Sequence, residues 1–125
     1  MTIAYWCVLA AAIMPFIWAS IAKKSKPGFN NKRPRQFLAS LDGLGARAHA
    51  AHQNSFEAFP FFAAGVIIAQ QIGSMDQSLI DYLAIAFIAL RVLFGIFYLT
   101  NMHWQRSLVW IAALGCNIAL FVMSA

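Results

Sequence analysis

The sequence predicts an all-α integral membrane protein, a bundle of four transmembrane helices that forms one domain over residues 1–125. Of its residues, 62% are hydrophobic and only 10% are charged, whereas a soluble domain carries about 25% charged residues. The apolar residues fall into four tracts, each close to the roughly 20 residues that a spanning helix needs. The basic residues are also concentrated, since six of nine lie between Lys23 and Arg35, in a polar stretch between two apolar tracts.

The first span is predicted over residues 3–22, a run without a charged side chain. Lys23 and Lys24 follow the run and no positive side chain precedes it, which favours a spanning helix over a signal peptide. Pro15 predicts a kink, which neighbouring helices tolerate in a membrane. The basic residues that follow indicate a cytoplasmic loop. An anionic lipid or nucleic acid is the functional alternative for this loop, but the sequence carries no nucleic-acid-binding module.

The second and third spans are predicted over residues 44–72 and 78–100. The second is polar in its first half and apolar from Ala58 onward, and the turn after it contains no Lys or Arg, as expected outside the cytoplasm. The third places Asp81 near its outer end and Arg91 well inside. The fourth span, residues 107–124, carries no charged side chain. We therefore expect a multi-pass protein with both termini outside the cytoplasm and loops one and three inside it.

Two ionisable residues lie within the predicted spans, Glu57 and Arg91. Such a residue costs about 2.5–3.5 kcal/mol at the centre of a membrane helix and normally has a partner. Helix geometry puts Glu57 about 20 Å and Arg91 about 15 Å from the cytoplasmic ends of their helices. Their comparable depth predicts an ion pair.

The polar residues of these spans fall on one stripe. Arg47, Asn54 and Glu57 lie within about 80° of one another on a helix, and Arg91 shares a face of the next span with Tyr98. Arg106 follows in the third loop. Arginines bind carboxylates, in bidentate fashion where geometry allows, and Glu57 suits an ammonium group. The stripe predicts a site for a small ligand with several carboxylates and an ammonium, open to the cytoplasm. The alternative is that these residues only hold the helices together.

The remaining chemistry-bearing residues predict no metal site. His49 and His52 are three residues apart, which permits a metal pair but indicates one only weakly. Hydration or packing near the membrane interface is the favoured interpretation. Cys7 and Cys116 lie in apolar tracts with no metal-binding spacing, and we interpret them as small buried hydrophobic residues.

The segment "AHQNSFEAFPFF", residues 51–62, resembles the second-helix motif of the MAPEG family, the membrane-associated proteins in eicosanoid and glutathione metabolism. Asn54, Glu57, Pro60 and Phe62 match that motif. The segment "RVLFGIFYLT" followed by Arg106 is similar to the third-helix pattern of the family. The resemblance covers essentially the whole chain and is most specific in the second helix.

The resemblance implies a homotrimer that binds glutathione between neighbouring subunits, as the co-substrate of a transferase or peroxidase. Hydrophobic electrophiles or lipid hydroperoxides would be the other substrate. Asn54, Glu57, Arg91 and Tyr98 would contact glutathione, and Arg106 would stabilise its thiolate as the catalytic residue.

The chain departs from the family pattern at three positions. Ala50 stands where the motif has an arginine, for which Arg47 is the candidate replacement, while Ala58 and Phe94 stand where relatives have tyrosines. These losses keep open a non-catalytic protein that binds a lipid or other ligand in the same pocket. A small proton-coupled exporter is the third hypothesis, although Arg91 at the depth of Glu57 argues against it.

Overall fold

The computed structural model describes all residues, 1–125, and is entirely helical, with no strand. Four helices are long and apolar enough to cross a membrane, which confirms the predicted fold class. The chain also has one short helix, α2. In chain order the five helices are α1 (Ile3–Lys24), α2 (Pro34–Ala39), α3 (Gly43–Ile72), α4 (Gln77–Leu99) and α5 (His103–Val122).

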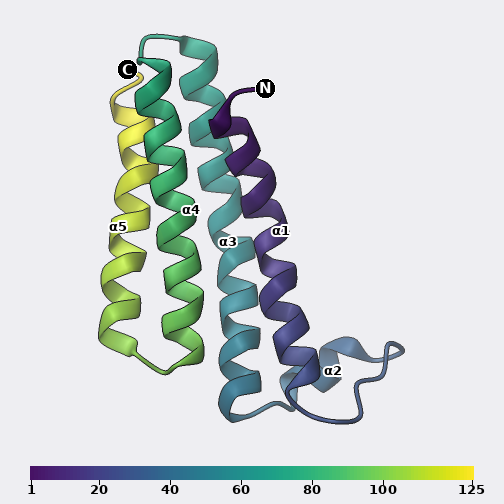
Figure 1. Ribbon diagram of the computed structural model, residues 1–125. Helices are drawn as coiled ribbons and strands as arrows, with labels where there is room; N and C mark the ends of the chain where they lie inside the picture. The colour runs from purple at the N-terminus through teal and green to yellow at the C-terminus, as the bar shows by residue number, and fades with distance from the viewer.

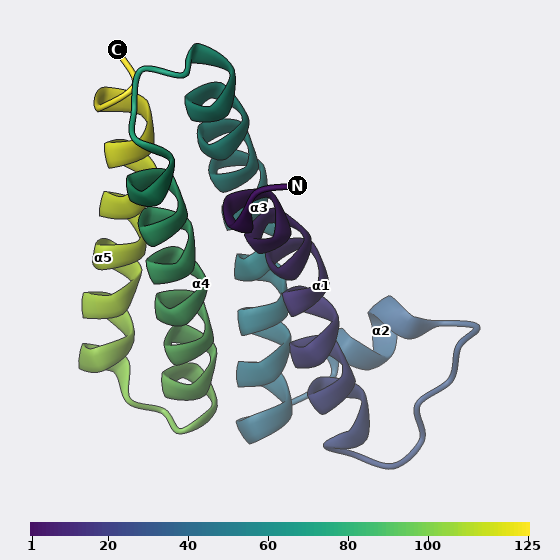
Figure 2. The same ribbon diagram turned by 45° about the horizontal axis from the view of Figure 1, so that its top comes forward.

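The four long helices run side by side, and both termini lie at the same end of the bundle (Figure 1). The loop between α4 and α5 lies at the opposite end, as do α2 and the basic segment that precedes it. In Figure 2 this segment projects sideways from the ends of α1 and α3. Loops one and three therefore share one end, as the predicted topology requires, and the side of the membrane they face stays a prediction.

Local sequence explains where several helices begin and end. Thr2 caps α1, because its side chain accepts a hydrogen bond from the backbone N–H of Tyr5. Pro34 opens α2 at the first helical turn, where its fixed φ and missing N–H suit the helix. Gly73 ends α3 in the left-handed conformation, with φ 70°, which a residue without a Cβ adopts at little cost.

Helices α1 and α3 approach each other through small residues. The buried residues of α3 include Ala48, Ser55, Phe62 and Ala69, a spacing of seven that is typical of long helices packed side by side. Alanines of both helices line this interface, as is common where spanning helices meet closely. The fully buried apolar side chains Phe62, Val66, Ile80 and Leu120 lie in the half of the bundle that carries the termini. Phe62 stacks there on Phe87 of α4 with ring centroids 4.0 Å apart.

The contact between α1 and α4 depends on one glycine. Gly95 of α4 is buried, and the indole of Trp18 on α1 occupies the place where a Cβ at this position would stand. A residue with a side chain would overlap the six-membered ring of Trp18. Gly95 is thus a packing requirement of the bundle.

A network of side-chain hydrogen bonds ties the spanning helices at the end that holds the termini. Asp81 accepts from the backbone N–H of Ala4 at 2.9 Å and from Gln77 at 3.0 Å. Gln70 pairs with Gln77 through both amides and accepts from the hydroxyl of Thr2. Nearby, the hydroxyl of Ser74 donates to the carbonyl of residue 124, just past α5. This end network connects α1, α3 and α4 and fastens the end of α5 to the turn after α3.

Candidate functional site

Two adjoining cavities lie between α3, α4 and α5. The inner cavity, of about 190 Å³, extends along α5 toward the termini. The outer cavity, of about 420 Å³, lies beside the first turns of α5. Both are lined by Asn54 and Trp110, so we treat the two adjoining cavities as one candidate site. Of the predicted site residues, the inner cavity is lined by Asn54, Glu57 and Arg91, and the outer cavity by Asn54, Tyr98 and Arg106.

Arg91 and Asn54 form the central polar contact of the site. The guanidinium Nη2 of Arg91 donates to Oδ1 of Asn54 at 2.7 Å, and the side chain of Arg91 is only 3% exposed. The guanidinium carbon also lies 4.2 Å from the ring centroid of Phe94, a cation–π contact. The buried charge is therefore held by an amide oxygen and an aromatic face.

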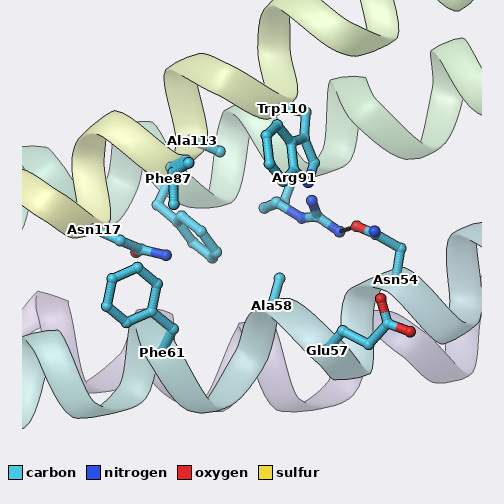
Figure 3. Close-up of a pocket in the computed structure, with 10 residues that line it drawn as sticks. Asn54, Glu57, Ala58, Phe61, Phe87, Arg91, Trp110, Ala113 and Asn117 are labelled. Carbon is cyan, nitrogen blue, oxygen red and sulfur yellow. Dashed lines mark hydrogen bonds between the residues drawn. The ribbon is translucent and has the colours of Figure 1, made fainter.

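The predicted ion pair between Glu57 and Arg91 is replaced by this amide contact. Figure 3 draws a hydrogen bond from Arg91 to Asn54 and none to Glu57, which stands on the next turn of α3 beside Asn54. Both Glu57 and Arg91 line the inner cavity, but the amide of Asn54, not the carboxylate of Glu57, lies within hydrogen-bond distance of the guanidinium. Glu57 thus keeps both oxygens available to a ligand.

Glu57 is exposed on the surface of the single chain. It lies about 20 Å from the start of α3, a helix of about 45 Å at 1.5 Å per residue. A carboxylate at that depth normally faces the protein interior or a water-filled cavity. Its position at the mouth of the inner cavity meets this condition in part, and leaves a side of Glu57 for another molecule to cover.

Tyr98 and Arg106 form the rim of the outer cavity. The guanidinium of Arg106 lies 4.1 Å from the ring centroid of Tyr98, and Tyr98 meets Phe94 edge to face at 5.5 Å. The stack orients Arg106 without neutralising its charge. A cation and a phenol hydroxyl are therefore presented at the end of the site nearest the loop between α4 and α5.

Arg47 lies outside both cavities. Its Nε donates to the backbone carbonyl of Leu99 at 3.2 Å, where α4 ends. This bond fastens α3 to α4 and satisfies a carbonyl that has no partner within its own helix. The predicted role of Arg47 in ligand binding stays a prediction, because Arg47 is not among the residues that line either cavity.

Trp110 and Asn117 are among the lining residues on α5 that were not predicted as site residues. Trp110, which we interpreted as a membrane-interface residue, lines both cavities. Asn117 lines the far end of the inner cavity and is 3% exposed. An asparagine seven residues after a tryptophan, on the same helix face, was the available signal. The positions that depart from the family motif include Ala58 in the inner wall and Phe94 in the outer wall.

The histidines lie apart from this site. His49 and His52 have ring centroids 5.8 Å apart, and His52 packs against Phe56 at 5.2 Å. Neither histidine lines the inner or the outer cavity. No group of three or more His, Cys, Asp or Glu side chains is arranged to hold a metal ion.

The arrangement suits an anionic ligand that also carries one cationic group. Arg91 and Arg106 supply positive charge, Asn54 and Tyr98 supply neutral hydrogen-bonding groups, and Glu57 supplies the single carboxylate. Charged hydrogen bonds are stronger in a site partly shielded from water. The inner wall is otherwise apolar, so the site joins a polar region to a hydrophobic one.

Comparison with known proteins assigns the chain to one family description. The model of the MAPEG family matches residues 3–125, which is essentially the whole chain. No curated protein and no solved structure matches it.

Proposed function

Since the chain belongs to the MAPEG family, we propose that it is a glutathione-dependent transferase or peroxidase of the membrane. Its substrates would be lipophilic electrophiles or lipid hydroperoxides. The observation that carries the proposal is the convergence of Asn54, Glu57, Arg91, Tyr98 and Arg106 on two adjoining cavities. Glutathione has two carboxylates, an ammonium group and a thiol, and this set offers a partner for one carboxylate, for the ammonium group and for the thiolate.

The polar groups divide the tasks of binding and activation. Arg91, held by Asn54, attracts a carboxylate, and Glu57 takes the ammonium group. Arg106 on the rim stabilises the thiolate, which is the nucleophilic form of the thiol. The ring of Tyr98 orients the Arg106 side chain by stacking on its guanidinium group. The apolar walls of the cavities hold the hydrophobic substrate against the sulfur.

Two reactions follow from an activated thiolate. In a transfer, the sulfur forms a bond to an electrophilic carbon, and the leaving group departs with the bonding electron pair. In a reduction, the sulfur attacks the terminal oxygen of a hydroperoxide, the O–O bond breaks, and the alcohol takes up a proton. The sulfur keeps the oxygen as a sulfenic acid. The thiol of a second glutathione attacks this sulfenic acid, so that the disulfide forms and water leaves.

A homotrimer is part of the same proposal. Glu57 is exposed on the single chain although it lies midway along a spanning helix. A neighbouring subunit would shield this carboxylate from lipid and close the open side of the site. Burial of such a charge against protein avoids the cost of exposing it to hydrocarbon.

Glu57→Gln is expected to weaken glutathione binding about tenfold or more, since a charge-assisted hydrogen bond becomes a neutral one. The measurement is the rise in unfolding temperature that glutathione causes in detergent, because ligand stabilisation scales with concentration over Kd. Asp76→Asn is the matched control, an acid-to-amide change in the turn after α3. Equal glutathione shifts in wild type and Glu57→Gln, or none in wild type, would count against the proposal.

Arg106→Gln is expected to remove the ultraviolet absorbance of enzyme-bound glutathione thiolate while changing affinity only a few fold. Arg106→Lys retains the charge and should recover part of the signal, whereas Arg35→Gln, in the basic segment, should leave it unchanged. If wild type binds glutathione without any thiolate signal, the non-catalytic binding protein becomes the better description, as the losses at Ala58 and Phe94 suggest.

A further inference from the structure

The inner cavity ends at a polar group that the protein itself does not satisfy. Asn117 is 3% exposed, and its Oδ1 is buried with no hydrogen-bond partner in the chain. Leaving such a group unpaired in a fold is costly. In Figure 3 the amide of Asn117 lies beside the rings of Phe61 and Phe87 at the end of the cavity, with its nitrogen toward the cavity.

The wall around Asn117 is apolar and fixed. Phe87 is almost fully buried and is held from behind by its stack on Phe62. Phe61 stacks on Phe121 of α5 at 5.2 Å and stands on the open side of the cavity. Ala113, one turn before Asn117 on α5, leaves room between the rings. A flat or narrow apolar group fits this space better than a charged one.

The polar end of the cavity lies about two helical turns away. Trp110 and Asn117 are seven residues apart on one face of α5, which corresponds to roughly 10 Å. Arg91 and Glu57 lie toward the Trp110 end of the same cavity. A molecule reaching Asn117 therefore has its other end beside the charged residues.

We propose that Asn117 and the rings of Phe61 and Phe87 form a binding site for an apolar molecule that carries one hydroxyl or similar hydrogen-bonding group. The apolar part lies between the rings, and the polar group bonds to the amide of Asn117. This inference deepens the proposed function: the site would select the hydrophobic co-substrate, and Asn117 would determine specificity. It concerns binding only and assigns no chemical step to Asn117.

Photoaffinity labelling of the full chain in nanodiscs tests the proposal. The probes are a trifluoromethyl-diazirine benzyl alcohol and the matching phenyl diazirine that lacks the hydroxymethyl group. We expect the alcohol to label peptides of α3 and α5 around Phe61 and Asn117, and excess benzyl alcohol to compete. Asn117→Leu should lower this labelling about fivefold, which corresponds to one neutral hydrogen bond. Labelling by the probe without a hydroxyl should stay the same or rise.

A second measurement keeps the test independent of any folding defect. Because the amide is unpaired in the ligand-free protein, Asn117→Leu should unfold at the same or a higher temperature than wild type. A fall in unfolding temperature, or equal loss of labelling with both probes, would mean that Asn117 has only a structural role and would overturn the proposal. So would labelling by the alcohol that Asn117→Leu leaves unchanged.

The two proposals fail in different ways. The labelling needs no glutathione, so it is run without and with glutathione. Asn117-dependent labelling in a protein that binds no glutathione would leave this site standing and remove the enzyme. Glutathione binding in a protein whose labelling ignores Asn117 would do the reverse.

Discussion

Replacing Gly95 by alanine is expected to destabilise the bundle by about 1–3 kcal/mol, the usual cost of overpacking a close-packed core. The added Cβ would overlap the indole of Trp18, and Trp18 is itself buried, so neither helix yields without opening the contact between α1 and α4. The measurement is thermal or denaturant unfolding of the protein in detergent, followed by circular dichroism.

Gly115→Ala is the matched control for this prediction. Gly115 also lies within a long helix, but an added Cβ there meets nothing within 4 Å. Alanine should therefore leave stability unchanged or raise it by up to about 1 kcal/mol, through its higher helix propensity. Trp18→Leu combined with Gly95→Ala should recover part of the loss, since neighbouring sites are not additive. Equal effects of the two alanines would show that the Trp18 contact is unimportant.

Asn54→Leu is expected to have the second large effect, on stability and on ligand binding together. The substitution removes the acceptor for Arg91 and leaves a buried guanidinium without its hydrogen bond, at a cost of about 1.5–3 kcal/mol. Asn54 lines both cavities, so glutathione binding should be lost as well. Unfolding and calorimetric binding in detergent measure the two effects separately.

The neighbouring amide provides the control. Gln53→Leu makes the same kind of change one residue earlier, at an exposed position, and should alter neither property appreciably. Asn54→Asp retains an acceptor for Arg91 and should keep most of the stability while weakening the binding of an anionic ligand. If Asn54→Leu were as stable as wild type, the contact with Arg91 would not be the one that holds the site together.

The helices were predictable because hydropathy and charge report directly on the solvent of each segment. Four apolar tracts and the basic cluster after Lys24 were enough to give the four spanning helices. The short helix α2 lies in a stretch for which the sequence predicts only a loop, since its six residues give too little periodicity to recognise a helix. Gly95 gave no signal in the sequence, because its importance depends on the position of Trp18, far away in the chain.

The candidate site was predictable in membership but not in detail. Helical spacing brought Asn54 and Glu57 to one face, and depth matched them to Arg91. Spacing could not decide which of the two would meet the guanidinium, since that depends on distances of a few ångströms between helices. Asn117 was missed because the site was sought around charged side chains, and Asn117 is a neutral amide in an apolar helix.

The hydrogen-bond network at the termini has a mechanical consequence. Gln70, Gln77 and Asp81 link α3 and α4 to each other and to the start of α1. The first turns of α5 make no side-chain hydrogen bond to another helix and contact α4 through the stack of Arg106 on Tyr98. We therefore expect motion of α5 relative to α3 to be smaller at the end that carries the termini than beside the outer cavity, which hydrogen exchange of the α5 amides measures.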